Sequence, residues 1–304
     1  MVTLMRSAVV ALAACGGSTA DGRADALAVD SQDVATPACD VTKPFGTPIP
    51  VADVNTTDND TWGWQTSDQR TIYFARFSIG FSDGDLYVAT RAQQSDVFTG
   101  AVPLDGVNTA NNERRPILTA DGLTLYAEAT PNNDADIKVA TRASTSASFS
   151  ALTSIPEINS TSVNDFNPWI SDDGLTLYFT SSRNGSHDIF KTIRTSGGVF
   201  DSPVAVDELN TNLGDYMGAL SEDGLEIVFA SRRNNAGAND DIFHATRSTR
   251  DEPFGVPTML ADLSGATTDD YPTWISADRC QLMFSSDRPD GSGGYDIWIA
   301  TRPK

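Results

Sequence analysis

The sequence predicts an all-β protein folded as a single five-bladed β-propeller, and three observations carry this prediction. A block of 51 to 54 residues recurs five times, each block contains four short strand-like segments, and no stretch keeps a helical period for more than a turn or two. A four-stranded sheet of this size exposes an apolar face, so it must stack on neighbours of its own kind. Radial stacking leaves only short, protected edges.

Landmark residues recur in constant order and define the blocks. A Phe opens each block, an Asn follows ten residues later, an Asp marks a turn, and the last strand ends in Arg. The repeats therefore lie near residues 45–97, 98–148, 149–199, 200–253 and 254–302. The landmarks are Phe45, Phe98, Phe149, Phe200 and Phe254; Asn55, Asn108, Asn159, Asn210 and the variant Ser264; Asp68, Asp121, Asp173, Asp223 and Asp278; and Arg91, Arg142, Arg194, Arg247 and Arg302.

The third block shows the strands most clearly. Residues 151–158 and 167–171 are predicted strands, and Asp172-Asp173-Gly174 is a tight turn of the hairpin type. Residues 175–180 alternate apolar and polar side chains, as a half-buried strand does, and residues 188–194 form the fourth strand.

The two ends of the repeat region predict how the ring closes. The fifth block lacks an outermost strand, whereas residues 48–54 form an outer strand with no blade before them. We expect residues 48–54 to complete the blade of residues 271–302, which removes two open sheet edges. Cys39 precedes this strand and Cys280 lies in the turn of the last blade, so we predict a Cys39–Cys280 disulfide; two buried free thiols are the alternative.

Charge and composition restrict the partners. The chain carries 41 acidic against 21 basic groups, a formal net charge of −20. Phosphate binding depends on clustered Lys and Arg, so the sequence predicts no nucleic-acid partner and no direct contact with an anionic membrane.

The N-terminus has the pattern of an export signal. Arg6 precedes the apolar run Ala8 to Ala14, and Leu12 to Gly16 resembles the lipobox of bacterial lipoproteins. This resemblance implies a signal peptide over residues 1–14 and lipidation of Cys15, and an ordinary cleavage site after Ala14 is the alternative. Residues 15–42 have almost no large apolar side chains and are expected to form a flexible acidic tether to a propeller over residues 43–304. The expected location is the outer membrane or cell surface, or alternatively the periplasm, with membrane contact only through the lipid.

Two segments resemble a known repeat. Residues 171–183 (Ser-Asp-Asp-Gly-Leu-Thr-Leu-Tyr-Phe-Thr-Ser-Ser-Arg) and 284–298 are similar to the TolB-type β-propeller repeat of periplasmic and outer-membrane-associated bacterial proteins. The resemblance covers residues 44–302 and is weakest in the second block, where residues 127–131 replace the Phe-x-Ser-x-Arg core. It implies a propeller fold and a binding or assembly role. It does not extend to the partners of TolB, which has a further N-terminal domain and a different number of blades.

A carboxylate stands eight residues before each turn Asp, at the expected start of each innermost strand. These five groups are predicted to ring one mouth of the central channel, where like charges raise one another's pKa unless they are compensated. Hydrogen bonds within each loop are one compensation, Arg114 and Arg115 beside the second carboxylate are another, and a Ca²⁺ ion held by the four Asp residues is a third. The five are Asp60, Glu113, Asp165, Asp215 and Asp270, and the candidate calcium ligands are Asp60, Asp165, Asp215 and Asp270.

Other candidate site residues favour structure over chemistry. Trp64, Trp169 and Trp274 recur four residues before the turn Asp, which predicts packing between blades, with a sugar-stacking platform as the alternative. His187 and His244 belong to different blades, and no spacing suggests a nucleophile–base pair or a His- or Cys-rich metal site.

The sequence thus predicts a non-enzymatic, monomeric envelope propeller that binds protein or polysaccharide and needs no cofactor other than the candidate Ca²⁺. The alternative is a glycoside hydrolase that uses channel carboxylates.

Overall fold

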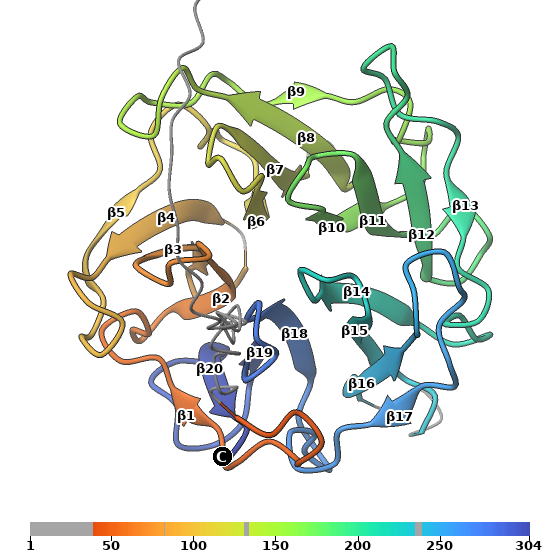
Figure 1. The fold of residues 1–304 in the computed structure, drawn as a ribbon. Coiled ribbons are helices and arrows are strands. Elements are labelled where there is room, and N and C mark those ends of the chain that lie inside the picture. The colour runs from red at the N-terminus through yellow and green to blue at the C-terminus, as the bar shows by residue number, and fades with distance from the viewer. Residues whose placement is uncertain (1–38, 82, 131–133, 235–238) are drawn as a thin grey trace, which may run out of the picture. The chain divides into compact units, whose positions relative to one another are not determined.

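A computed structural model describes residues 39–81, 83–130, 134–234 and 239–304, so the predicted signal peptide, Cys15 and nearly all of the predicted tether lie outside the described residues. The described residues form five four-stranded antiparallel sheets arranged around a central axis (Figure 1). This confirms the predicted all-β, five-bladed propeller. The described ranges contain strands but no helix, and therefore no helical segment that could cross a membrane.

Each blade is a meander that runs from an innermost strand at the axis to a short strand at the rim. The first blade contains β2 (Asn59–Gln65), β3 (Thr71–Phe77), β4 (Asp85–Thr90) and β5 (Thr99–Pro103). The second contains β6 (Glu113–Leu118), β7 (Thr124–Ala129), β8 (Asp136–Thr141) and β9 (Thr153–Ser154). The third contains β10 (Asp165–Ile170), β11 (Thr176–Ser181), β12 (Asp188–Ile193) and β13 (Val204–Ala205). The fourth contains β14 (Asp215–Leu220), β15 (Glu226–Ser231), β16 (Asp241–Thr246) and β17 (Thr258–Met259). The fifth contains β18 (Asp270–Ile275), β19 (Gln281–Ser286), β20 (Asp296–Thr301) and β1 (Ile49–Pro50).

The ring closes as the sequence predicts. Strand β1 pairs antiparallel with β20, with Ile49 opposite Ile299, and a disulfide joins Cys39 to Cys280. The outermost strands are much shorter than predicted, since β9 covers two residues of the predicted strand 151–158. The tether boundary at residue 42 also needs correction, because the disulfide and a hydrogen bond from the Asp40 amide to the Pro303 carbonyl fix the chain from Cys39 onward.

The landmark residues of the repeat join one block to the next. Each strand-ending Arg stacks on the Phe that opens the following block, with the guanidinium carbon 4.1–4.4 Å from the ring centre. Arg302 of the last block stacks on Phe45 of the first, so the same contact closes the ring. Each landmark Asn bonds the backbone of the preceding blade's third strand, and Asn55 makes this contact with Ile297 across the closure.

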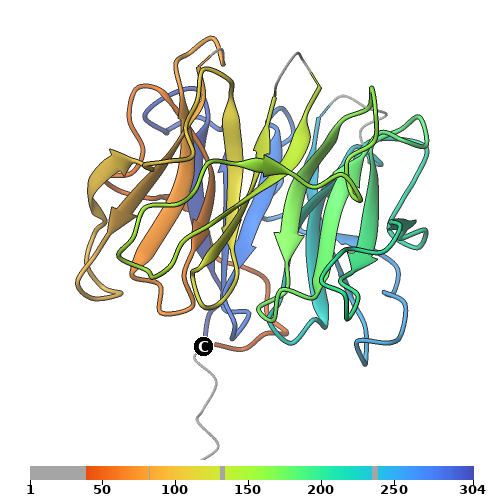
Figure 2. The same ribbon diagram turned by 90° about the horizontal axis from the view of Figure 1, so that it is seen from above.

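The two faces of the propeller carry different groups. The upper face is defined here as the side on which the innermost strands begin, and the lower face as the side that carries the turn Asp residues, Cys280 and the C-terminus (Figure 2). Every innermost strand contains a β-bulge near its middle, which re-aims the side chains at the channel. At this bulge Trp62, Arg115 and Asn167 adopt positive φ angles of 52°, 55° and 53°.

Candidate functional site

The five predicted ring carboxylates are completely buried. Asp60, Glu113, Asp165, Asp215 and Asp270 each have 0% exposed surface, and none lines the channel cavity. The cavity is lined instead by residues two to four positions further along each innermost strand. The sequence therefore located the start of each innermost strand, but the expectation that these carboxylates face the channel is wrong, because their side chains bond the loop that leads into the strand.

Each Asp of the ring is neutralised within its own blade. Arg76, Arg183, Arg233 and Arg288 lie with a guanidinium nitrogen 2.6–2.7 Å from the carboxylate of Asp60, Asp165, Asp215 and Asp270 in turn. Backbone amides of the preceding loop donate to the same carboxylates, as Thr56 does to Asp60 at 2.6 Å. Charge-assisted bonds of this kind hold a buried carboxylate ionised. Desolvation by burial still raises the pKa of Asp60, against the hydrogen bond from Thr56 and the charge of Arg76.

Blade 2 departs from this pattern. Glu113 accepts bonds from Thr109 but, among the described residues, has no Arg partner of the kind found in the other blades, and desolvation raises its pKa. The carboxylate of the neighbouring buried Glu128 instead lies 3.1 Å from Nε of Arg114 and 3.0 Å from Nε of Arg115. The structure thus brings together the Arg pair and Glu128, which lies in the segment 127–131 where this blade departs from the repeat.

The ring geometry favours hydrogen bonding over a metal. Within the described ranges, no group of three or more carboxylate, His or Cys side chains is placed to hold a metal ion. Calcium at Asp60, Asp165, Asp215 and Asp270 stays a hypothesis from the sequence, to be tested by calorimetry of the folded protein.

An aromatic collar surrounds the upper mouth of the channel. Neighbouring rings lie with centroids 5.1–6.5 Å apart, mostly tilted or edge to face, which is the geometry that aromatic pairs prefer. Arg115 closes the circle, because its guanidinium carbon lies 4.4 Å from the ring centre of Trp62 and 5.6 Å from that of Phe166. In order around the mouth, the aromatic collar consists of Trp62, Phe77, Phe81, Tyr295, Tyr271, Tyr216, His187 and Phe166.

Two acids, the buried Asp240 and the partly buried Asp269, fix two Tyr residues of the collar. The Tyr271 hydroxyl donates to Asp240 at 2.6 Å and the Tyr295 hydroxyl to Asp269 at 3.1 Å. Arg232 makes a bidentate ion pair with Asp240 at 3.0 and 3.1 Å. Burial and the neighbouring carboxylates raise the pKa of both Tyr hydroxyls, so they stay protonated and act as donors.

His187 is a neutral member of the collar at pH 7. Its Nδ1 lies 3.1 Å from the Tyr216 hydroxyl, and burial followed by the charge of Arg232 lowers its pKa. The Tyr hydroxyls of the collar and Nδ1 of His187 are thus bonded within the protein, whereas Nε1 of Trp62 has no hydrogen-bond partner among the described residues.

The recurring Trp residues lie at the opposite end of the channel. Trp64, Trp169 and Trp274 line a cavity of about 60 Å³ at the lower mouth. Trp64 and Trp169 pack against Tyr73 and Tyr178 on the second strands of their own blades. Trp169 also belongs to a buried hydrophobic cluster that includes residues of neighbouring blades, such as Ile117 and Met217. Trp169 also borders an outer groove of about 420 Å³ that contains Asp172 and Glu222.

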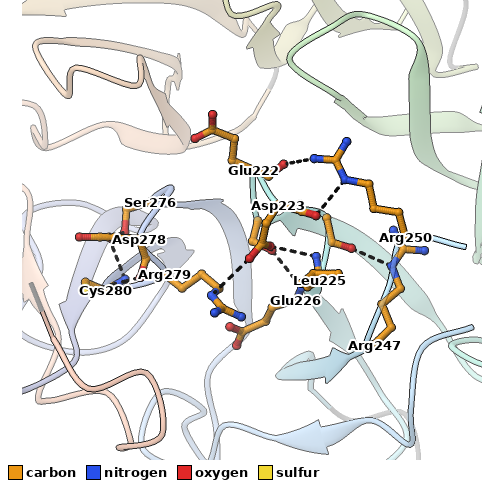
Figure 3. A network of polar contacts seen from close by, with 12 residues as sticks. Glu222, Asp223, Leu225, Glu226, Arg247, Arg250, Ser276, Asp278, Arg279 and Cys280 are labelled. Atoms are coloured by element: carbon orange, nitrogen blue, oxygen red, sulfur yellow. Dashed lines mark hydrogen bonds and ion pairs between the residues drawn. The ribbon is translucent and has the colours of Figure 1, made fainter. Parts of the chain in front are cut away.

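Arginines fasten the lower-face turns of the last blades (Figure 3). Arg250 donates to the carbonyl oxygens of Glu222 and Asp223 at 2.7 and 2.9 Å, and Arg247 donates to that of Gly224. From the next blade, Arg279 beside Cys280 reaches the Asp223 carboxylate at 3.8 Å. Arg247 and Arg250 thus hold a turn of their own fourth blade, and Arg279 links the fifth blade to the fourth.

Sequence reasoning missed the aromatic collar. One signal was present, because the residue after the ring carboxylate is Phe166, Tyr216 and Tyr271 in three successive blades. Phe81 and Tyr295 occupy non-equivalent positions in upper-face loops, so no fixed period marks them.

These features define a closed five-bladed propeller with a structural carboxylate ring and an aromatic upper mouth. No protein-family model matches the sequence, and a search of curated proteins finds no match.

Solved structures match its fold at low identity. A putative TolB from Agrobacterium tumefaciens is 12% identical with a TM-score of 0.50, covering 84% of this chain and 89% of its own. The catalytic domain of a Coprinopsis cinerea GH62 α-L-arabinofuranosidase is 12% identical with a TM-score of 0.53, covering 85% and 96%. TolB from Acinetobacter baumannii is 16% identical with a TM-score of 0.47; the match covers 81% of this chain but spans only 55% of that protein. The likeness extends to TolB proteins and to glycoside hydrolases alike, and it concerns the fold.

Proposed function

We propose that this protein is a non-enzymatic binding module of the bacterial cell envelope whose protein or polysaccharide partner docks on the aromatic collar. The single observation that carries the proposal is the collar itself, a continuous circle of rings drawn from blades 1, 3, 4 and 5 and closed by Arg115 of blade 2. Five rings of the collar are at least partly exposed and can contact a partner, whereas Trp62, Phe77 and Tyr216 are buried. The envelope location rests on the export pattern of residues 1–16.

The burial of the ring carboxylates also supports binding over catalysis. A glycoside hydrolase needs two carboxyl groups that reach the substrate, about 5 to 10 Å apart. The four ring Asp residues are buried and paired with Arg, and Glu113 is equally buried, so none is placed to protonate a sugar.

One observation favours the hydrolase as a second candidate. In the outer groove that Trp169 borders, the carboxyl groups of Asp172 and Glu222 interact. Burial, followed by the charge of Glu222, raises the pKa of Asp172. An acid with a raised pKa beside a second carboxyl group and Trp169 is a combination that glycosidases use. Hydrolysis of arabinan, fructan or xylan that is abolished in both Asp172→Asn and Glu222→Gln would establish this alternative.

The proposed function predicts that collar variants lose their partner. The full-length protein with Phe81→Ala and Tyr295→Ala is expected to retain less than about a tenth of the material that the wild type captures from envelope extract, because both rings are at least partly exposed. Capture is quantified by mass spectrometry and glycan analysis. The matched control removes two exposed apolar side chains from the rim, Val204→Ala and Val256→Ala, and should capture as the wild type does. Equal capture by the collar variant and the rim variant contradicts the proposal.

A further inference from the structure

The same position of three successive blades faces the channel with an unusual backbone. Trp62, Arg115 and Asn167 all have left-handed φ angles, which cost free energy for Trp and Arg and persist where the surrounding structure enforces them. All three side chains line one channel cavity of about 30 Å³, just below the aromatic collar. Blades 4 and 5 place Met217 and Pro272 at the equivalent position, so the polar side of the cavity belongs to blades 1 to 3.

These side chains carry buried polar atoms without partners. Asn167 is 4% exposed, and neither its Oδ1 nor its Nδ2 has a hydrogen-bond partner among the described residues; the same holds for Nε1 of Trp62. Arg115 donates no hydrogen bond within the described ranges, and its polar contact there is the 3.0 Å approach of Nε to Glu128. Buried polar groups without partners are costly and rare, so those of Asn167 and Trp62, which line one cavity beside Arg115, indicate a bound group.

The charges around the cavity indicate an anion. Arg114 and Arg115 share the single carboxylate of Glu128, which leaves this group of three with a net charge of +1. Burial lowers the pKa of Arg115 to about 10, Glu128 offsets part of that effect, and Arg114 adds to it. An anion against Arg115 would restore neutrality where the protein has desolvated a cation.

The size and donors of the cavity select the kind of anion. A volume of about 30 Å³ holds roughly two water molecules, which is room for a carboxylate group but not for a sugar ring. A guanidinium fork matches the planar carboxylate, and the indole N–H and the Asn amide add neutral donors.

We infer that the channel binds a small carboxylate between Trp62, Arg115 and Asn167, and that this group anchors the ligand that rests on the aromatic collar. The second half of this statement rests on the proposed function; the carboxylate site itself does not. The inference concerns the group that enters the channel, and acetate serves as a small probe for it.

Acetate titration of the full-length protein tests this site. At an ionic strength of about 0.2 M, set by the sodium salt of a bulky sulfonate buffer that cannot enter the cavity, acetate is expected to bind in calorimetry and to raise the melting temperature. Its neutral isostere acetamide should do neither. Arg115→Met should weaken acetate binding by about tenfold or more, and Asn167→Gly, which tolerates the left-handed backbone, by several-fold.

The controls separate the site from the fold and from the collar. The rim variant Val204→Ala/Val256→Ala leaves the cavity and the Arg114, Arg115 and Glu128 group unchanged, and should bind acetate as the wild type does. If Arg115→Met does not fold, Trp62→Phe removes the indole N–H, keeps an aromatic ring, and should weaken acetate binding several-fold.

Equal responses to acetate and acetamide would overturn the inference. Wild-type acetate affinity in the variants of Arg115, Asn167 and Trp62 that fold would also overturn it. Loss of envelope capture in the Phe81/Tyr295 variant together with no acetate binding would reject the carboxylate site and leave the proposed function standing.

Discussion

Replacing Cys39 and Cys280 by Ser is expected to lower the free energy of unfolding by about 5 kcal/mol, one of the two largest effects of a local change in this molecule. The two residues are 241 positions apart, so the disulfide closes nearly the whole propeller into one loop. In the chain-entropy model the stabilisation grows with loop length, because the cross-link restricts the unfolded chain. The bond also holds the segment before β1 against the last blade, where the Gly46 amide bonds the Thr301 carbonyl.

Urea unfolding followed by fluorescence measures this loss. Cys15→Ser is the matched control, because it removes the third Cys of the chain without touching the disulfide, and its stability should equal that of the wild type. Reduction of the wild type should reproduce the double variant. A difference below about 1 kcal/mol between oxidised and reduced protein would show that the closure does not depend on this bond.

Replacing Glu226 by Ala is expected to cost about 3 to 5 kcal/mol. Glu226 and Arg302 are 3% and 4% exposed, and their charged groups lie 2.8 Å apart between the fourth and fifth blades. His244 contacts the same carboxylate at 3.1 Å. Without Glu226 the Arg302 guanidinium stays buried with no counter-charge, at the point where Arg302 also stacks on Phe45. The double variant Glu226→Gln/Arg302→Met should lose less than the sum of the single changes, and simple additivity would argue against a coupled pair.

The same carboxylate predicts a loss of stability in acid. Although burial opposes the shift, the bonds from His244 and Arg302 lower the pKa of Glu226 to about 2 from an ordinary 4.5. A depressed folded-state pKa stabilises the protein above the unfolded-state value, and this stabilisation disappears as pH falls toward the folded-state value. Between pH 5 and pH 2 the wild type should therefore lose about 3 kcal/mol more than Glu226→Gln in urea unfolding. Parallel curves for the two proteins would contradict the assignment.

Much of the fold could be predicted because its contacts repeat in the sequence. The Phe, Asn and Arg landmarks recur since each makes the same contact between successive blocks, and Arg302 makes it with Phe45 across the closure. The disulfide and the β1–β20 pairing followed from the same count of strands. The lengths of the outer strands could not be predicted from this count. Backbone pairing at the rim depends on how loops 143–152 and 195–203 leave the sheet.

The candidate site was less accessible to sequence reasoning for a physical reason. A β-bulge shifts which residues face the channel, so counting from Asp165 places the wrong side chain there and conceals Asn167. The collar draws Phe81 and Tyr295 from loops of unlike length, which no period describes. Blade 2 was noticed because it breaks the repeat, and the contacts of Glu128 with Arg114 and Arg115 explain why it does.

Two neighbouring residues give the most direct test of the division between a structural ring and a binding collar. Asp165 is fully buried against Arg183, whereas the next residue, Phe166, belongs to the collar. The test measures the melting temperature of each variant and its capture of material from envelope extract well below that temperature. Asp165→Asn should lower the melting temperature and leave capture at the wild-type level. Phe166→Ala should reduce capture and melt within a few degrees of the wild type. The reverse result, in which the folded Asp165→Asn protein loses its partner and Phe166→Ala keeps it, would contradict the account.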